Sequence, residues 1–207
     1  HRYFEATDSG PVFGRIVALN DWVDADSNRL LQDRLEYRFY RTPASFRLLD
    51  LEVTLYASEG EVRLGDTKEG GIISVRVAYP LEVNHGGRIE NAVGGIDEAE
   101  TWGKRAAWCD YSGRLGENTV GIAVMDHPAN LRHPTYWHVR NYGLMTANPF
   151  GLSFFVGEDA DGSYVLPEGA RVRFRYRLCV HAGDVAEGRV GEKYLNWVFP
   201  PSVQVQE

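Results

Sequence analysis

The sequence lacks most of the features that reveal a protein's environment. It has only two cysteines in 207 residues, too few for a disulfide-rich scaffold. Cys109 and Cys179 both fall in strand-like stretches, so we expect two buried free thiols, with one disulfide as the alternative. No apolar run reaches the roughly 18 residues of a transmembrane helix, which predicts no membrane span. No signal peptide is visible, and the sequence does not specify a compartment.

The chain also lacks a basic excess and the common nucleotide and hydrolase motifs. Asp and Glu number 29 against 22 Lys and Arg, for a net charge of −7, which argues against a nucleic-acid partner. Gly-x-x-x-x-Gly-Lys and Gly-x-Ser-x-Gly are both absent, so neither a phosphate-binding loop nor a serine nucleophile elbow is expected. A Cys-His or Ser-His-Asp arrangement cannot be identified either.

Apolar and polar residues alternate with a period of two through several stretches. The clearest spans 171–180, where Val172, Phe174 and Tyr176 oppose four arginines. The same pattern occurs at 34–40, 48–56, 72–79 and 120–124. Turn-forming residues separate these stretches and no βαβ unit appears. We therefore predict one all-β domain over 1–207, an antiparallel β-sandwich, with the arginines on a solvated or cross-strand-paired face.

One helix is expected, near the C-terminus. Within residues 184–199, Val190, Tyr194, Trp197 and Val198 follow helical spacing. Two glycines in the same stretch weaken the pattern, so the helix should be short.

The segment 126–142 has the highest density of side chains suited to chemistry. It contains three of the six histidines, and His127 and His133 each precede a proline that restricts the backbone. Histidine supplies acid/base or metal-binding groups near neutral pH. Together with arginine, asparagine and tryptophan, it suits a hydroxyl-rich ligand such as a sugar. The structural alternative is that Asp126 and Asn130 satisfy turn amides and the histidines are ordinary hydrogen-bonded residues.

Two other segments are candidates. The glycine-framed stretch 65–71 holds Lys68 beside Glu69, a pairing that can tune acid/base behaviour; the alternative is a solvated hairpin turn. Trp102 and Trp108 are six residues apart, a spacing that on one strand places both on one face. They would then form a stacking platform for a sugar ring, although core packing is more common for tryptophan.

Several phrases together resemble one uncharacterised bacterial family, labelled PmoA-like or "methane oxygenase PmoA". The phrases are Gly-Asp-Thr-Lys-Glu-Gly at 65–70, Trp-Gly-Lys at 102–104, Trp-Cys-Asp-Tyr-Ser-Gly at 108–113, Gly-Ile-Ala-Val-Met-Asp-His-Pro-Ala-Asn at 121–130, His-Pro-Thr-Tyr-Trp-His-Val-Arg-Asn-Tyr-Gly at 133–143 and Ala-Asn-Pro-Phe-Gly at 147–151. The resemblance covers most of the chain, and its last two phrases are the most specific.

The resemblance implies a large β-sandwich akin to sugar mutarotases and a carbohydrate-related role. Genes of the family often lie near those of sugar oxidoreductases and isomerases. A methane oxygenase subunit would need membrane-spanning helices, which this sequence does not predict. Family members usually carry an upstream Asp-His-Pro-His-His phrase, so the resemblance also implies an N-terminal portion that the chain shown lacks.

The leading hypothesis is a carbohydrate-active lyase, hydrolase or isomerase that performs acid/base chemistry on a sugar: epimerisation, elimination or glycosidic cleavage. The expected catalytic residues are His127, His133, His138, Glu69 and Asp126. The expected substrate-binding residues are Asn130, Arg132, Trp137, Arg140, Tyr142, Lys68 and Trp102. One alternative is a non-catalytic carbohydrate-binding sandwich. Another is a metal-dependent oxygenase with a divalent metal on His127, His133 and His138. Homo-oligomerisation is left open.

Overall fold

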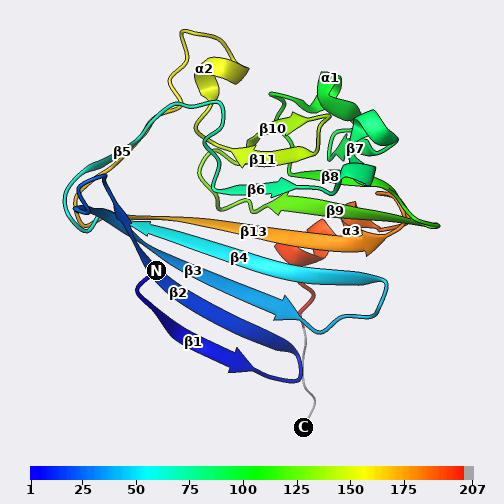
Figure 1. Ribbon diagram of the computed structural model, residues 1–207, viewed down its shortest axis with the longest axis horizontal. Coiled ribbons are helices and arrows are strands. Elements are labelled where there is room, and N and C mark those ends of the chain that lie inside the picture. Colours follow the sequence, from blue (N-terminus) through cyan, green and yellow to red (C-terminus); the bar gives the residue numbers. More distant parts are fainter. Residues whose placement is uncertain (203–207) are drawn as a thin grey trace.

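β-Strands make up most of the computed structural model, which describes residues 1–202 (Figure 1). The strands are β1 Tyr3–Ser9, β2 Phe13–Val23, β3 Arg29–Tyr40, β4 Phe46–Tyr56, β5 Val62–Leu64, β6 Ile73–Arg76, β7 Arg88–Asn91, β8 Trp108–Leu115, β9 Asn118–Asp126, β10 Tyr136–Arg140, β11 Leu144–Asn148, β12 Tyr164–Leu166 and β13 Arg171–Ala182. The helices are α1 Asp97–Thr101, α2 Leu152–Phe155 and α3 Val190–Val198, with 3-10 turns η1 Tyr79–Leu81 and η2 Val83–His85.

A large sheet and a small sheet form the two main layers. The large sheet has eight strands in the order β1-β2-β3-β4-β13-β9-β8-β7, and every pairing is antiparallel. The small sheet has three strands in the order β10-β11-β6. In Figure 1 it lies above the part of the large sheet formed by β13, β9 and β8. Strands β5 and β12 pair separately at one end. The predicted all-β antiparallel sandwich is confirmed.

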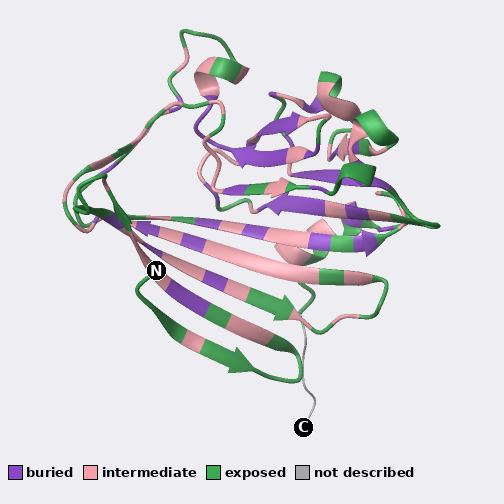
Figure 2. Ribbon diagram, in the orientation of Figure 1, coloured by how far each residue is buried: buried purple, intermediate pink, exposed green. Residues whose placement is uncertain are grey.

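The main core fills the space between these sheets. From the large sheet, Val53, Tyr111 and Phe174 point inward, and from the small sheet Trp137 and Met145 meet them. Each of these residues alternates with a polar or exposed neighbour, as the period of two predicts. Figure 2 shows that burial is concentrated on β8–β11, whereas most of β1 and the ends of β2 and β3 are exposed.

Helix α3 covers part of the opposite face of the large sheet. Its Val190 packs in a second cluster with Trp108, Met125 and Cys179. Cys109 belongs to the main core on the other face, so the two cysteines cannot bond, and both are free and buried as expected.

Two of the predicted elements are shorter than expected, for identifiable reasons. The stretch 72–79 ends as a strand at Arg76, because Pro80 lacks an N–H group and Tyr79 begins a 3-10 turn. The helix begins at Val190 rather than 184, since Arg189 adopts a left-handed conformation with φ of 49°. Gly188 lies directly against the His181 ring, where a Cβ would come within 2.3 Å of Nδ1.

Candidate functional site

Strand β10 divides the histidine-rich segment between the core and the outer face of the small sheet. Trp137 and Val139 point into the core and are fully buried. His138 and Arg140 alternate with them and therefore point to the outer face. Trp102, Lys68 and Glu69 approach His138 from other parts of the chain. These residues, together with Arg140, form the largest group of predicted site residues that the structure brings together. We refer to this region as the His138 site.

The His138 imidazole is oriented by a hydrogen bond from a tryptophan. Trp102 Nε1 donates to His138 Nδ1 at 3.0 Å. An indole N–H can only donate, so Nδ1 accepts and the proton of the neutral ring is on Nε2. Burial, together with the positive charge of Arg140, lowers the pKa of His138. The side chain is therefore neutral at pH 7 and presents an N–H group.

His138 Nε2 is buried and has no hydrogen-bond partner within residues 1–202. Only 1% of the residue is exposed, so water does not freely satisfy this donor. An unsatisfied buried donor destabilises a fold by about 1–3 kcal/mol. Such a group is rare in a folded protein and calls for an explanation, of which a role in ligand binding or catalysis is one.

The turn 65–71 lies against the small sheet beside His138. Asn148, at the end of β11, donates from Nδ2 to the carbonyls of Thr67 and Lys68 at 2.9 and 2.8 Å. Gly71 packs so closely that a Cβ would come within 2.2 Å of Thr146 Cγ2. These contacts fix the backbone on either side of Lys68 and Glu69.

Lys68 and Glu69 present their charges on this anchored turn. Lys68 Nζ is 3.6 Å from a Glu69 carboxylate oxygen, and 72% of the Glu69 side chain is exposed. The negative charge of Glu69 favours the protonated form of His138 and so opposes the effects of burial and Arg140. Those two effects are larger, and the pKa of His138 remains lowered. Asp66 has a different role: its Oδ2 accepts from the backbone N–H groups of Ser153 and Gly162 at 3.0 and 2.7 Å, which ties the turn to α2 and the segment after it.

The other end of the site is built on an ion pair. Arg140 Nε lies 2.9 Å from Glu98 Oε1. Glu98 Oε2 also accepts from the backbone N–H of Asn141, and the Asn141 side chain accepts from the backbone N–H of Glu98. Helix α1 is thereby docked on β10. Tyr142 lies further out, with the Arg140 guanidinium 5.4 Å from its ring centre.

Aromatic rings border His138. Trp102 and Phe155 form an edge-to-face pair with centres 5.4 Å apart. Phe155 also stacks on Tyr136 at 5.7 Å, and its ring centre is 6.5 Å from that of His138. Trp108 is absent from this group because it is buried under α3. The stacking platform considered from the sequence is therefore wrong, because Trp102 follows α1 whereas Trp108 begins β8. For Trp108 the alternative of core packing holds.

Asp126 and its partners lie elsewhere and hold a loop together. Asp126 is 1% exposed. Its carboxylate accepts from Asn130 Nδ2 at 2.7 Å, the His133 Nδ1 at 2.8 Å and the Thr135 backbone N–H at 3.0 Å. Asn130 in turn exchanges two hydrogen bonds with the backbone of Arg175. The Asp126 carboxylate and the Asn130 side-chain amide are thus used internally, as the structural alternative predicted for these two residues.

Two predicted substrate-binding residues are engaged in contacts within the protein instead of facing a ligand. Trp137 is fully buried, and its Nε1 donates to the Ala106 carbonyl at 2.9 Å, so its ring cannot stack on a sugar. Arg132 donates to the carbonyls of Pro149, Gly162 and Ser163. It bridges three backbone segments rather than reaching outward.

His127, His133 and His138 do not form a metal site. Within residues 1–202, no group of three or more His, Cys, Asp or Glu side chains is placed to hold a metal ion. His138 lies on the outer face of the small sheet, whereas His127 contacts Trp197 of α3 with ring centres 5.0 Å apart. The residues present therefore do not fit the divalent metal considered from the sequence.

Several residues of the site were not singled out from the sequence. Asn148 lies within the Ala-Asn-Pro-Phe-Gly phrase at 147–151. That phrase supports the family resemblance, but the resemblance assigns no role to the asparagine. Glu98 and Phe155 had no sequence signal at all. Their contribution depends on packing between α1, α2 and β10, which no local pattern encodes.

The chain belongs to a family of unknown function, DUF6807, whose model matches residues 1–195. The expectation of an uncharacterised family is confirmed, while the PmoA label is not part of that match. No curated protein shows significant similarity. Among solved structures, a GalM/aldose epimerase homologue from C. elegans matches with a TM-score of 0.35 and 8% identity, over 88% of this chain and 69% of that one. Similarity this distant gives no information about the site.

No helix within the described part of the chain has the length and apolar character needed to cross a membrane.

Proposed function

We propose that the His138 site binds a sugar or sugar derivative and transfers a proton at a carbon next to its carbonyl group. The observation that carries the proposal is the buried, unpartnered Nε2–H of neutral His138 near the exposed carboxylate of Glu69. Epimerisation and elimination both begin with such a proton transfer. The expectation of acid/base chemistry from the sequence is thus assigned to specific groups.

Glu69 is the base and His138 is the hydrogen-bond donor. The Glu69 carboxylate removes the proton from carbon, and the electron pair of that C–H bond moves toward the carbonyl oxygen. The Nε2–H of His138 donates to this oxygen as negative charge develops there. A preorganised donor stabilises the transition state more than the ground state. A neutral imidazole is suited to this role because Trp102 fixes its tautomer.

The neighbouring groups fit a hydroxylated ligand. Lys68, which is 38% exposed at its side chain, supplies a donor, and the Trp102 and Phe155 rings supply apolar surface. Because only 1% of His138 is exposed, neighbouring side chains must move before a ligand reaches Nε2. Glycosidic cleavage fits less well, because Glu98 is held by Arg140 and a second available carboxyl group is required.

Hydrogen–deuterium exchange tests the proposal directly. The protein is incubated in D2O with a panel of aldoses, ketoses and oxidised sugars, and NMR follows deuterium entering the carbon next to the carbonyl. Glu69→Gln and His138→Gln should each slow this exchange by about 10²–10⁴-fold, the usual contribution of a positioned acid/base group. Glu61→Gln and His85→Gln are matched controls outside the site, and we expect them to exchange at the wild-type rate.

The main competing function is a non-catalytic carbohydrate-binding sandwich. Aromatic rings beside hydrogen-bonding groups are also typical of a site that binds a sugar without reacting with it. It predicts that a sugar binds at the site with no deuterium incorporation, and that Glu69→Gln leaves binding largely intact. Exchange that is equal in the wild type and in both site variants would remove this site from the chemistry.

A further inference from the structure

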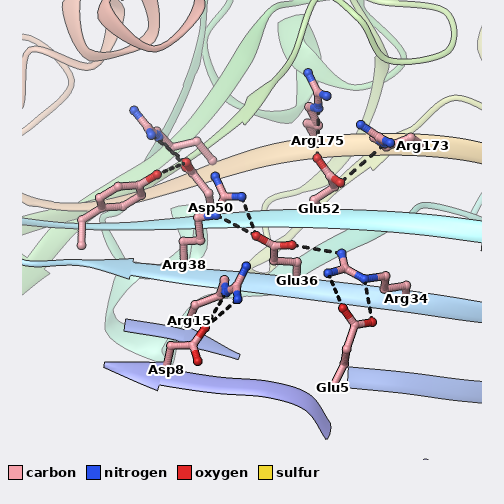
Figure 3. Close-up of polar contacts among 12 residues, drawn as sticks. Glu5, Asp8, Arg15, Arg34, Glu36, Arg38, Asp50, Glu52, Arg173 and Arg175 are labelled. Atoms are coloured by element: carbon pink, nitrogen blue, oxygen red, sulfur yellow. Dashed lines mark hydrogen bonds and ion pairs between the residues drawn. The ribbon is translucent and has the colours of Figure 1, made fainter. Parts of the chain in front are cut away.

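A second candidate binding site lies on the opposite face of the large sheet. A cavity of about 470 Å³ opens there beside α3, within the roughly 300–1,000 Å³ typical of small-molecule pockets. Its walls include Glu36, Glu52, Arg173, Arg175, His127 and Trp197. Figure 3 shows that charged side chains from β3, β4 and β13 converge on this face. The His138 site shares none of these residues.

Most carboxylates around the cavity are fully occupied by arginines. Asp50 accepts two hydrogen bonds from Arg177, at 2.6 and 2.7 Å, and a third from Tyr40 at 2.8 Å. Glu36 lies between Arg34 and Arg38 and accepts from both. These arginines outweigh burial and lower the pKa of Glu36, so it stays ionised. The floor of the cavity is therefore rigid and charged.

Arg173 and Arg175 differ because they share a single carboxylate. Arg175 Nε donates to Glu52 at 3.1 Å, and Arg173 Nε lies 3.5 Å from the other Glu52 oxygen (Figure 3). Within residues 1–202, the terminal nitrogens of these two arginines have no hydrogen-bond partner. Their side chains are 54% and 39% exposed. These three side chains together therefore carry one excess positive charge, and several guanidinium N–H groups are available.

His127 adds an oriented donor to the same cavity. The backbone N–H of Ala129 donates to His127 Nδ1 at 3.0 Å, so the proton of the neutral ring is on Nε2. Burial and the charge of Arg175 lower the pKa of His127. Trp197 packs edge-to-face against this imidazole at 5.0 Å and fixes the position of the ring.

We propose that this cavity binds a hydroxylated carboxylate, that is, a sugar acid. Arg173 and Arg175 bind the carboxylate, because planar guanidinium groups match its two oxygens. The Glu52 carboxylate, which accepts one hydrogen bond from Arg175, accepts further hydrogen bonds from ligand hydroxyls, and His127 Nε2 donates to one. A ligand without the carboxylate would leave the excess positive charge unpaired. A ligand without hydroxyls would make no hydrogen bond to Glu52.

Titration calorimetry with a matched set of small molecules tests the proposal. The probes are galacturonate and gluconate as sugar acids, galactose as the neutral counterpart, acetate as a carboxylate without hydroxyls, and inorganic phosphate as a different oxyanion. We expect the sugar acids to bind at least about tenfold more tightly than galactose or acetate, since a charged hydrogen bond contributes that much or more. Phosphate that binds as tightly as the sugar acids would overturn the assignment to carboxylates.

Single variants then place the binding on this face. Arg173→Gln should weaken galacturonate binding by about tenfold or more. The Arg173 side chain is 54% exposed, so we expect the variant to fold as the wild type does. Arg171→Gln is the control: it lies on the same strand, but its guanidinium stacks on Tyr56, 4.8 Å from the ring centre, outside the cavity. Unchanged binding in Arg173→Gln and Arg175→Gln, or the absence of binding by both sugar acids at millimolar concentration, would overturn the proposal.

The two sites can be tested independently. The His138→Gln variant should bind galacturonate in this cavity as the wild type does. Arg173→Gln should retain any deuterium exchange at the His138 site. The failure of one proposal therefore leaves the other standing.

Discussion

Replacing Asn148 with alanine would test how the turn carrying Lys68 and Glu69 is held in place. The Asn148 side chain is fully buried. It donates to the carbonyls of Thr67 and Lys68 at 2.9 and 2.8 Å and accepts from the Phe150 backbone N–H at 2.8 Å. Each such bond contributes about 0.5–1.5 kcal/mol net. Asn148→Ala should therefore lower the free energy of unfolding by about 2–4 kcal/mol.

Urea unfolding followed by circular dichroism measures this change. The slope of free energy against urea should stay constant if only stability changes. Asn118→Ala, at the exposed start of β9, is the control and should shift stability by less than about 0.5 kcal/mol. Asn148→Ala should also slow deuterium exchange at the His138 site, although Asn148 would not touch the ligand. A loss below about 1 kcal/mol would refute the view that these bonds anchor the turn.

Three further changes probe the same region. Gly71→Ala places a Cβ 2.7 Å from the Ala147 carbonyl oxygen, so urea unfolding should show a loss of about 1–3 kcal/mol; a neutral effect would mean that the turn shifts freely. Trp137→Phe leaves the buried Ala106 carbonyl without its partner and should lower stability by about 1–3 kcal/mol, measured by thermal unfolding; an unchanged melting temperature would contradict this. The lowered pKa of His138 means that, below about pH 6.5, the unfolded chain binds a proton that the folded protein does not. Acidification therefore destabilises the wild type through this group. The unfolding free energy of the wild type minus that of His138→Gln should fall from about pH 7 to about pH 5. A constant difference would show that His138 is not neutralised by its surroundings.

The sequence by itself determined the strands and which residues face inward. In β13, Phe174 and Tyr176 are buried while Arg173 and Arg175 remain accessible, because side chains alternate along any extended strand. The same rule applied to β10 separates Trp137 from His138. The expected stacking role for Trp137 is wrong because this alternation places its ring in the core, where it is fully buried.

Only the tertiary structure decided which residues surround His138. The turn that carries Glu69 is anchored by Asn148, whose bond to Thr67 spans 81 positions in the chain. The Glu52–Arg175 contact at the second cavity spans 123 positions. Such contacts depend on which strands pair and how the two sheets pack. A local pattern of residues fixes the face of a strand but carries no information about the distant segment that will cover it.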